Sequence, residues 1–128
     1  MTTAVGPVLW IAAQQGKLSD VRTLLSCKGI DVEVQSGEMA LTSLHLASKN
    51  GHLMVVLRLI QYGADLKAVD RDGWTALHYA CFQNHESILL VLLHNGADVN
   101  CADANGVTCL MIAARYGLHK IAAILLFH

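Results

Sequence analysis

The chain has 128 residues, of which 54% are hydrophobic and 15% are charged. This balance excludes an intrinsically disordered chain, because such chains have too few apolar side chains to form a core. Nine Lys and Arg against ten Asp and Glu give a formal net charge of −1, which argues against nucleic acid or an anionic membrane surface as the partner.

Hydropathy predicts neither a membrane span nor an export signal. The longest apolar runs, Ile88–Leu93 and Ile121–Phe127, are much shorter than the roughly 20 residues that cross a bilayer. The segment Met1–Pro7 lacks the basic stretch and the long apolar stretch of a secretory signal. We therefore expect no membrane insertion, and a location in the cytoplasm, the nucleus or both.

The chain repeats itself with a period of 33 residues. Gly106–Ala113 matches Gly73–Ala80, which in turn matches Ala40–Ala47 at the same offset. Leu9–Gly16 is a weaker copy of Leu44–Gly51 at an offset of 35, and the two extra residues fall in loops, where insertions are tolerated. The sequence thus contains three full units and one that stops short, which is typical of a repeat protein.

Each unit predicts two short helices followed by a loop. Thr42, Thr75 and Thr108 are predicted N-caps, because a threonine oxygen accepts hydrogen bonds from the amides of a first turn. First helices follow at Leu44–Lys49, Leu77–Gln83 and Leu110–Tyr116. The second helices have apolar residues at i, i+3 and i+4 and end at Gly63 or Gly96, where a positive φ is wanted. Helices this short are marginal alone, so we expect the units to pack in series.

Two segments of the third unit resemble a known family. Thr75-Ala-Leu-His-Tyr-Ala80 and Asn95-Gly-Ala-Asp-Val-Asn100 are similar to the two signature stretches of the ankyrin repeat, and the similarity extends from Pro7 to His128. It implies an all-α solenoid of stacked helix–loop–helix units with projecting β-hairpin loops. It further implies one ankyrin repeat domain over 1–128, with units at roughly 6–38, 39–71, 72–104 and 105–128.

The first and last units depart from this pattern. Trp10 and Met111 stand where the middle units have the signature histidines His45 and His78, which in this family hydrogen-bond around the hairpin and the threonine. We expect the end units to be less regular. Ile121–Phe127 also lacks the polar outer face of a terminal unit, and we hypothesise that further repeats or another chain cover the last unit.

The sequence contains no constellation typical of catalysis or of a bound cofactor. No nucleophile elbow, phosphate-binding loop, dinucleotide fingerprint or set of paired acids occurs, so we expect no enzyme activity. The cysteines and histidines lack the spacing of a zinc site, and we expect no metal. Reduced thiols are expected at Cys27, Cys81, Cys101 and Cys109, and those of Cys101 and Cys109 are expected to be inert.

The resemblance implies a non-catalytic protein-interaction module, an adaptor or scaffold that holds a partner on its concave face and hairpin tips. Leu41, Trp74 and Val107 hold the same place in successive units and are predicted to form an apolar strip. Phe82 and Tyr116 add aromatic surface of the kind that dominates interfaces. By position, the predicted partner-binding residues are Leu41, Lys49, Arg71, Asp72, Trp74, Phe82, Gln83, Val107, Arg115 and Tyr116. Three of them are basic, so we expect an extended or helical partner segment with apolar anchors and an acid or two.

Several alternatives stay open at this point. Trp74 is either a binding residue or a filler packed on the neighbouring hairpin. Met54, Leu57 and Leu90 are apolar at second-helix positions that are normally charged, which predicts a second contact surface. The chain would then be a regulatory ankyrin segment of a larger enzyme, ubiquitin-ligase subunit or channel. Asn100 resembles the site that asparaginyl hydroxylases modify in ankyrin repeats, and its alternative role is to hydrogen-bond the hairpin.

Overall fold

The computed structural model describes residues 5–128. The expectation about a signal in Met1–Pro7 therefore falls largely outside the described residues. These residues form only α-helices, turns and two isolated β-bridges. The helices are α1 (Val5–Gln15), α2 (Leu18–Leu25), α3 (Ser43–Asn50), α4 (Leu53–Gln61), α5 (Ala76–Phe82), α6 (Glu86–His94), α7 (Cys109–Tyr116) and α8 (His119–Leu126).

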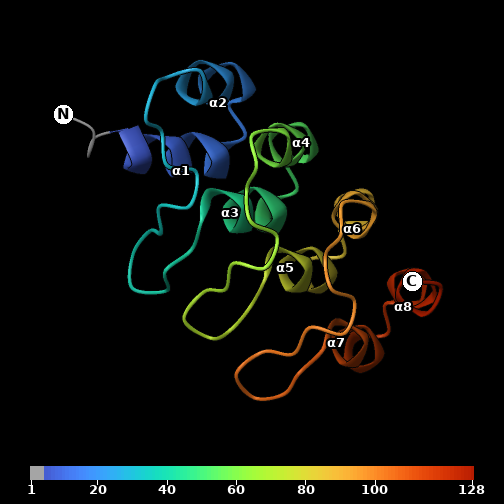
Figure 1. Ribbon diagram of the computed structural model, residues 1–128. Helices are drawn as coiled ribbons and strands as arrows, with labels where there is room; N and C mark the ends of the chain where they lie inside the picture. The colour runs from blue at the N-terminus through green and yellow to red at the C-terminus, as the bar shows by residue number, and fades with distance from the viewer. Residues whose placement is uncertain (1–4) are drawn as a thin grey trace.

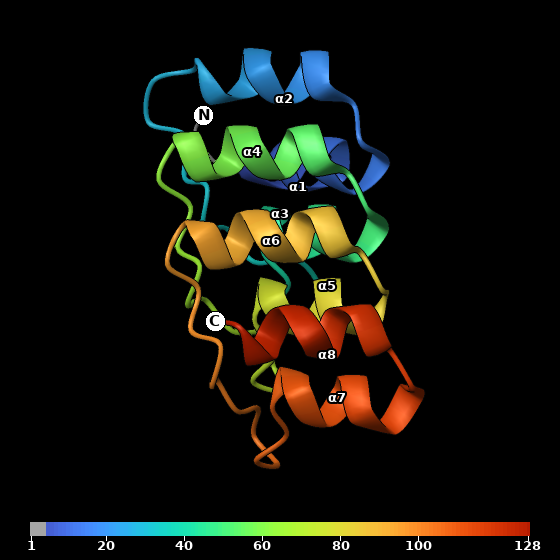
Figure 2. The same ribbon diagram turned by 90° about the vertical axis from the view of Figure 1, so that its right-hand side faces the viewer.

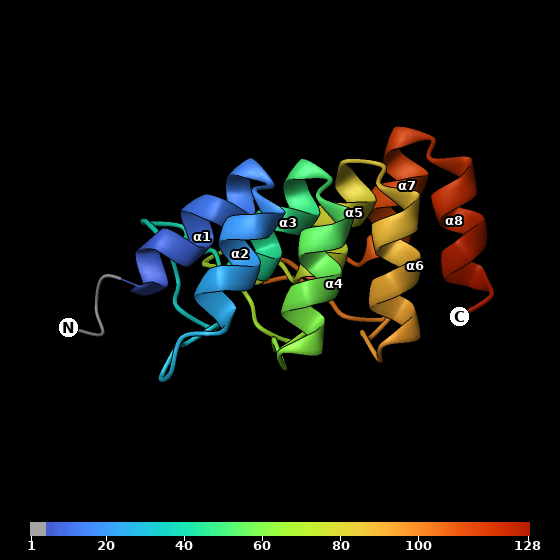
Figure 3. The ribbon, with the colours of Figure 1, turned by 90° about the horizontal axis from the view of Figure 1, so that it is seen from above.

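The helices form two rows that follow the same direction through the molecule. The inner row contains α1, α3, α5 and α7, and the outer row contains α2, α4, α6 and α8 (Figures 1 and 3). Each inner helix packs on the outer helix that follows it, and α1, α3 and α5 each also pack on the next inner helix. We number the four helix pairs as units one to four. Figure 2 shows the outer helices side by side, so the units are stacked in series.

Three loops connect the units: loop one (26–42), loop two (62–75) and loop three (95–108). They project from the same side of the stack and meet the inner row at an angle (Figure 1). Single antiparallel bridges close loop one, between Ser36 and Leu41, and loop three, between Ala102 and Thr108. The all-α solenoid with projecting hairpin loops is confirmed. Each predicted unit contains one helix pair, except that α1 begins at Val5, one residue before the predicted boundary.

In each of the two middle units, a threonine and a histidine together cap the N-terminus of the first helix. The Thr75 oxygen accepts from the His78 amide at 3.4 Å, and His78 Nδ1 accepts from the Thr75 amide at 3.1 Å. Thr42 and His45 make the same two bonds, at 3.2 and 2.9 Å. This reciprocal arrangement is a capping box with histidine in the place of the usual Glu or Gln. It fixes the first turn of α3 and α5.

The same two histidines bind their unit to the next one. With Nδ1 accepting, each ring has its proton on Nε2. His45 Nε2 donates to the carbonyl oxygens of Trp74 at 2.9 Å and Ala68 at 3.0 Å, and His78 Nε2 donates to Val107 at 3.1 Å. Both side chains are at most 1% exposed. The predicted structural role of His45 and His78 is confirmed.

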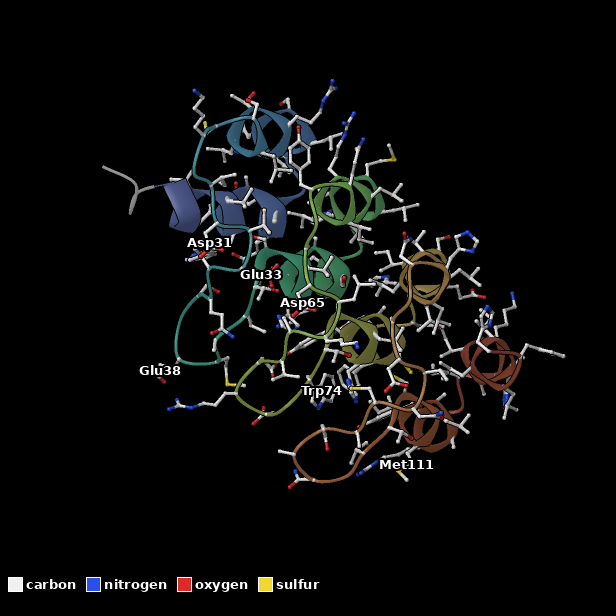
Figure 4. The ribbon with its side chains drawn as sticks, viewed as in Figure 1. Asp31, Glu33, Glu38, Asp65, Trp74 and Met111 are labelled. Atoms are coloured by element: carbon white, nitrogen blue, oxygen red, sulfur yellow. The ribbon has the colours of Figure 1, made fainter. Side chains whose placement is uncertain are left out.

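In unit four this connection is missing, as the sequence predicts. Thr108 accepts from the Met111 amide at 3.3 Å, but a methionine side chain has no nitrogen to complete the capping box. The Met111 side chain is 55% exposed, because no further unit covers it in the described residues. Figure 4 shows Met111 on α7, at the end of the inner row.

The loop aspartates accept hydrogen bonds that close turns, and the predicted glycines end the outer helices. Asp65 and Asp98 each accept from the backbone amide two residues later, at 2.9 Å. Asp70 accepts from the amides two and four residues later at 2.9 Å, which closes a tight turn. Gly63 and Gly96, which end the outer helices, have φ of 86° and 98°.

The helices of residues 5–128 are short compared with the thickness of a membrane. No helix in residues 5–128 is both long and apolar enough to span a bilayer, and the longest, α1, has 11 residues.

Candidate functional site

Four aromatic rings follow one another from loop two across α5 to α7. The ring of Trp74 lies 5.0 Å from that of Tyr79 and 5.6 Å from that of Phe82, between ring centroids. The Phe82 ring lies 5.4 Å from that of Tyr116, at the end of α7. All three pairs are edge-to-face, a favourable geometry for aromatic pairs. We call this series the aromatic ladder.

The ladder borders a cleft between units three and four. The cleft has a volume of about 260 Å³, which suits one or two apolar side chains rather than a large cofactor. Its walls come from α5, α7 and the base of loops two and three. The lining residues are Trp74, Phe82, Asp103, Val107, Met111, Ile112, Arg115 and Tyr116.

Trp74 is held in place by the next unit. Its indole Nε1 donates to Asp103 Oδ2 at 2.9 Å, and its ring stacks on His78 at 5.5 Å between centroids. The side chain is half-buried. Figure 4 shows Trp74 where loop two meets α5. Trp74 therefore packs on the neighbouring hairpin and still presents part of its ring to the cleft, so the two interpretations made from the sequence are compatible.

Asp103 is the polar group inside this wall. Besides the indole, its carboxylate accepts from the amides of Asn105 at 2.8 Å and Val107 at 2.9 Å. Burial alone would raise the pKa of Asp103, but these hydrogen bonds outweigh burial and lower it. Asp103 is thus a charged acceptor whose two oxygens are already used, and it fixes Trp74 rather than binding a ligand.

Tyr79 anchors the start of the ladder in the same way. Its hydroxyl donates to Asp70 Oδ2, and Asp70 is only 5% exposed. Burial and the carboxylate raise the pKa of Tyr79 far above 10, so it remains a neutral donor. The Lys49 ammonium lies 6.0 Å from the centre of the Tyr79 ring, within the range of a cation–π contact.

At the other end of the ladder, Arg115 places a positive charge on the rim of the cleft. Its guanidinium lies 5.8 Å from the centre of the Tyr116 ring, and both side chains are exposed. An arginine held against an aromatic face is well placed to bind a carboxylate in two-pronged geometry. Apolar walls and one basic group therefore meet at this site.

The structure brings half of the predicted partner-binding residues together. Trp74, Phe82, Val107, Arg115 and Tyr116 all line the cleft. The predicted apolar strip is only partly realised there, since Val107 joins Trp74 while Leu41 lies half-buried in loop one, bridged to Ser36.

The remaining predicted residues lie elsewhere on the loops and inner row. Arg71 contacts loop one, donating from its guanidinium to the Glu38 carbonyl at 3.1 Å. Asp72 accepts from the Ala104 amide at 3.0 Å through its carbonyl. Lys49 and Gln83 are exposed at the ends of α3 and α5. Their role in binding stays a prediction.

Sequence reasoning missed three residues of the cleft. Asp103 and Ile112 were assigned no binding role, and Met111 was interpreted only as a departure from the repeat. The signal for Met111 was present, because an apolar residue replaces the histidine that would otherwise bind the next loop. Nothing in the sequence pairs Asp103 with the Trp74 indole.

Two of the four cysteines, Cys81 on α5 and Cys109 on α7, contact each other. All four cysteines have free thiols, and Cys81 and Cys109 are fully buried. The Cys81 thiol donates to the Cys109 carbonyl at 3.2 Å. The neighbouring Cys81 side chain and burial raise the pKa of the Cys109 thiol, which keeps it protonated. Among residues 5–128 no three His, Cys, Asp or Glu side chains are grouped so that they could hold a metal ion.

Asn100 lies exposed in loop three. Its backbone amide donates to Asp98 at 2.9 Å, which fixes the turn without using the side-chain amide. Modification at Asn100 stays a prediction.

Comparison with known families decides what this stack is. A family model described as ankyrin repeats (3 copies) matches residues 9–103, which is more than half of the chain. This chain belongs to the ankyrin repeat family. A second model, described as ankyrin repeats (many copies), matches residues 83–127, so the matches include the helices on both sides of the cleft.

Several curated proteins contain a similar ankyrin segment. The inhibitor of Bruton tyrosine kinase from Xenopus laevis is 37% identical over 65 residues, which is 51% of this chain and 5% of that protein. Palmitoyltransferase AKR1 from Lachancea kluyveri is 40% identical over 63 residues, 49% of this chain and 8% of that protein. Ankyrin repeat domain-containing protein 49 from Bos taurus is 45% identical over 62 residues, 48% of this chain and 25% of that protein. The matched segments are thus small parts of longer relatives. Ankyrin repeats are protein-interaction modules, and that coarse function applies here.

Proposed function

We propose that this ankyrin domain is a non-catalytic adaptor that holds a segment of a partner protein in the cleft between α5 and α7. The partner segment places an apolar side chain against the aromatic ladder and a carboxylate on Arg115. The observation that carries the proposal is the exposure of Phe82 and Tyr116, at 40% and 54%, beside an apolar cleft. Exposed aromatic residues around a concavity are typical of interface hot spots.

Substitution of Phe82 and Tyr116 tests binding at the cleft better than substitution of Trp74 does. Replacing Trp74 also breaks its hydrogen bond to Asp103 and its stacking on His78, so stability and binding would fall together. Phe82 and Tyr116 are exposed and make fewer structural contacts.

A displayed library of random peptides, selected on the immobilised domain, tests the proposal. We expect the wild type to select peptides with an apolar residue next to Asp or Glu. The double variant Phe82→Ala/Tyr116→Ala should bind them about 30-fold or more weakly, because loss of even one hot-spot residue costs about 2 kcal/mol or more of binding free energy. The variant Arg115→Glu should lose the preference for the acid.

The matched control is Tyr62→Ala, which removes a ring that is 48% exposed at the end of α4 in the outer row. This variant should bind the selected peptides as the wild type does. If the double variant binds the peptides as tightly as the wild type, or if Tyr62→Ala weakens their binding as much as the double variant does, the cleft is not the binding site.

A second function is favoured by an apolar surface on the outer row. Met54, Leu57 and Leu90 are 55%, 38% and 43% exposed, and a groove of about 390 Å³ runs between α4 and α6 beside Leu57 and Leu90. Such a surface suits contact with another domain of a larger enzyme, ubiquitin-ligase subunit or channel. Immunoblotting of natural extract with an antibody against this chain tests it: a band much larger than 13.8 kDa supports the regulatory function, and a band of that mass contradicts it.

We also propose a cellular location for the chain and hydroxylation of Asn100. Four free thiols suit a reducing compartment, the cytoplasm or the nucleus, which cell fractionation tests. Mass spectrometry of the loop-three peptide, read for one added oxygen on Asn100, tests the hydroxylation.

A further inference from the structure

Lys49, Phe82 and Arg115 hold the same place in units two, three and four. They follow one another at the repeat period of 33 residues, and each lies in the last turn of its inner helix, α3, α5 or α7. All three side chains are exposed. Because equivalent positions of stacked units lie in line along a solenoid, these side chains form a row with a cation on each side of a ring. We call it the Lys–Phe–Arg row.

Both cations of this row lie against rings of the aromatic ladder. The Lys49 ammonium is 6.0 Å from the centre of the Tyr79 ring, and the Arg115 guanidinium is 5.8 Å from the centre of the Tyr116 ring. The ladder therefore has a positive charge at each end. A charge that already rests on a ring loses less side-chain freedom when it binds a carboxylate.

The surroundings of the row favour a negatively charged partner. Helices α3, α5 and α7 contain no Asp or Glu. Of the nearby loop carboxylates, Asp70 accepts from the Tyr79 hydroxyl and Asp103 accepts from the Trp74 indole. Asp72 is exposed, but it lies on loop two rather than on the inner row. Two acids of a partner therefore match the two cations of the row.

The spacing of the helices sets the length of chain between those acids. Helix α5 packs on both α3 and α7, and packed helices lie about 8–10 Å apart, so Lys49 and Arg115 are separated by roughly 16–20 Å. An extended chain advances about 3.3 Å per residue and turns every second side chain to the same face. Six residues of extended chain thus cover about 20 Å and place both acids on one face.

A helical partner fits this site less well. A helix needs about 11–13 residues to cover the same distance, and it presents a continuous apolar stripe of several side chains. The cleft has a volume of about 260 Å³, which suits one or two apolar side chains.

We infer that the partner segment is an extended strand with two acids six residues apart, one bound to Lys49 and the other to Arg115. This inference rests on the proposed function and adds the spacing and the second acid to it. The cleft is lined by Phe82, Arg115 and Tyr116 but not by Lys49. The apolar side chain that fills the cleft is therefore two residues from the acid on Arg115 and four residues from the acid on Lys49.

Two synthetic peptides of identical composition and charge test the spacing. The six-spaced peptide is Asp-Ser-Leu-Ser-Leu-Ser-Asp, which reads the same in both directions, so the direction of the bound chain does not matter. The five-spaced peptide is Asp-Ser-Leu-Ser-Leu-Asp-Ser, which turns its second acid to the opposite face. Both are acetylated and amidated, which removes the terminal charges, and their binding is measured by fluorescence anisotropy at low ionic strength.

We expect the wild type to bind the six-spaced peptide roughly two- to fivefold more tightly, the range expected for one exposed ion pair. In Lys49→Gln this difference should disappear, because the second acid has lost its cation. The matched control is Lys28→Gln, at an exposed lysine in loop one beyond the end of α2. This control should keep the full difference between the two peptides.

The outcomes separate this inference from the proposed function. Equal binding of the two peptides by the wild type, or an unchanged difference in Lys49→Gln, overturns the inference. The proposed function would survive either result, because the five-spaced peptide still has leucines beside an acid. If neither peptide binds, or if Phe82→Ala/Tyr116→Ala binds both as tightly as the wild type does, the proposed function is wrong and the inference is wrong with it.

Discussion

The imidazole ring of His78 has three structural roles. It caps α5 with Thr75, it fills the interface, and it donates to Val107 of the next loop. Because the side chain is fully buried, no water replaces these bonds when the ring is removed. A single residue therefore connects the start of a helix with the packing of two units.

Comparison of His78→Ala with Met111→Ala measures this effect. We expect His78→Ala to lower the free energy of unfolding by about 2–4 kcal/mol, through unpaired buried groups and a cavity. Met111 occupies the equivalent position with its side chain 55% exposed, so Met111→Ala should cost about 0.5 kcal/mol or less. Urea unfolding gives both values. Equal losses would contradict the structural role of the ring.

The protonation of His45 predicts how stability depends on pH. Burial lowers the pKa of His45 from its ordinary value of 6.5, although Asp70 and the carbonyls of Trp74 and Ala68 oppose the shift. The unfolded chain then takes up this proton at a higher pH than the folded chain does. Stability from this residue is therefore present above pH 6.5 and is lost as the pH falls towards the lower pKa of the folded state.

Urea unfolding one pH unit above and one below 6.5 tests this dependence. The midpoint of the wild type should fall on acidification, and the fall should be smaller in His45→Gln, which has no proton to take up. If the two proteins lose the same stability on acidification, His45 is not the titrating group.

Two glycines at equivalent helix ends show what one stacked unit adds to another. Gly51 and Gly117 end α3 and α7 with φ of 80° and 66°, a region that alanine adopts only at a cost. The two differ in their surroundings. At Gly51 an added Cβ would lie 2.8 Å from His85 Cε1, while His85 donates to the Lys49 carbonyl at 3.1 Å.

We therefore expect Gly51→Ala to cost more than Gly117→Ala. Backbone strain alone should lower the free energy of unfolding by about 1 kcal/mol at both positions. At Gly51 the displaced ring and the lost hydrogen bond should add about 1 kcal/mol. Equilibrium urea unfolding of the two variants measures the difference, and equal losses would show that His85 does not hold the units together.

Most of the helices and loops could be predicted from the sequence. The first helix of unit three was expected at Leu77–Gln83 and lies at Ala76–Phe82, because a threonine cap and apolar spacing are local signals. The cleft could not be predicted in the same way. Phe82 and Tyr116 meet at 5.4 Å although they do not hold equivalent positions in their units, so the contact depends on how far one unit is rotated on the next.

For the whole molecule, the fixed period is what allowed the stack to be predicted. A repeat of 33 residues containing two helices too short to be stable alone requires packing in series. The apolar segment Ile121–Phe127 predicted that the last unit has no polar outer face. The exposure of Val8 and Ile11 on α1 was not predicted, because the weak first copy of the repeat does not show which of its apolar residues stay uncovered.

The central claim is that a unit is stabilised by the neighbouring units that cover its faces. Amide hydrogen exchange followed by mass spectrometry tests it most directly. The account predicts the slowest exchange in α3 and α5, which are covered on both sides, and faster exchange in α7 and α8, which are covered on one side. Equal protection along the whole stack, or α8 as protected as α6, would contradict it.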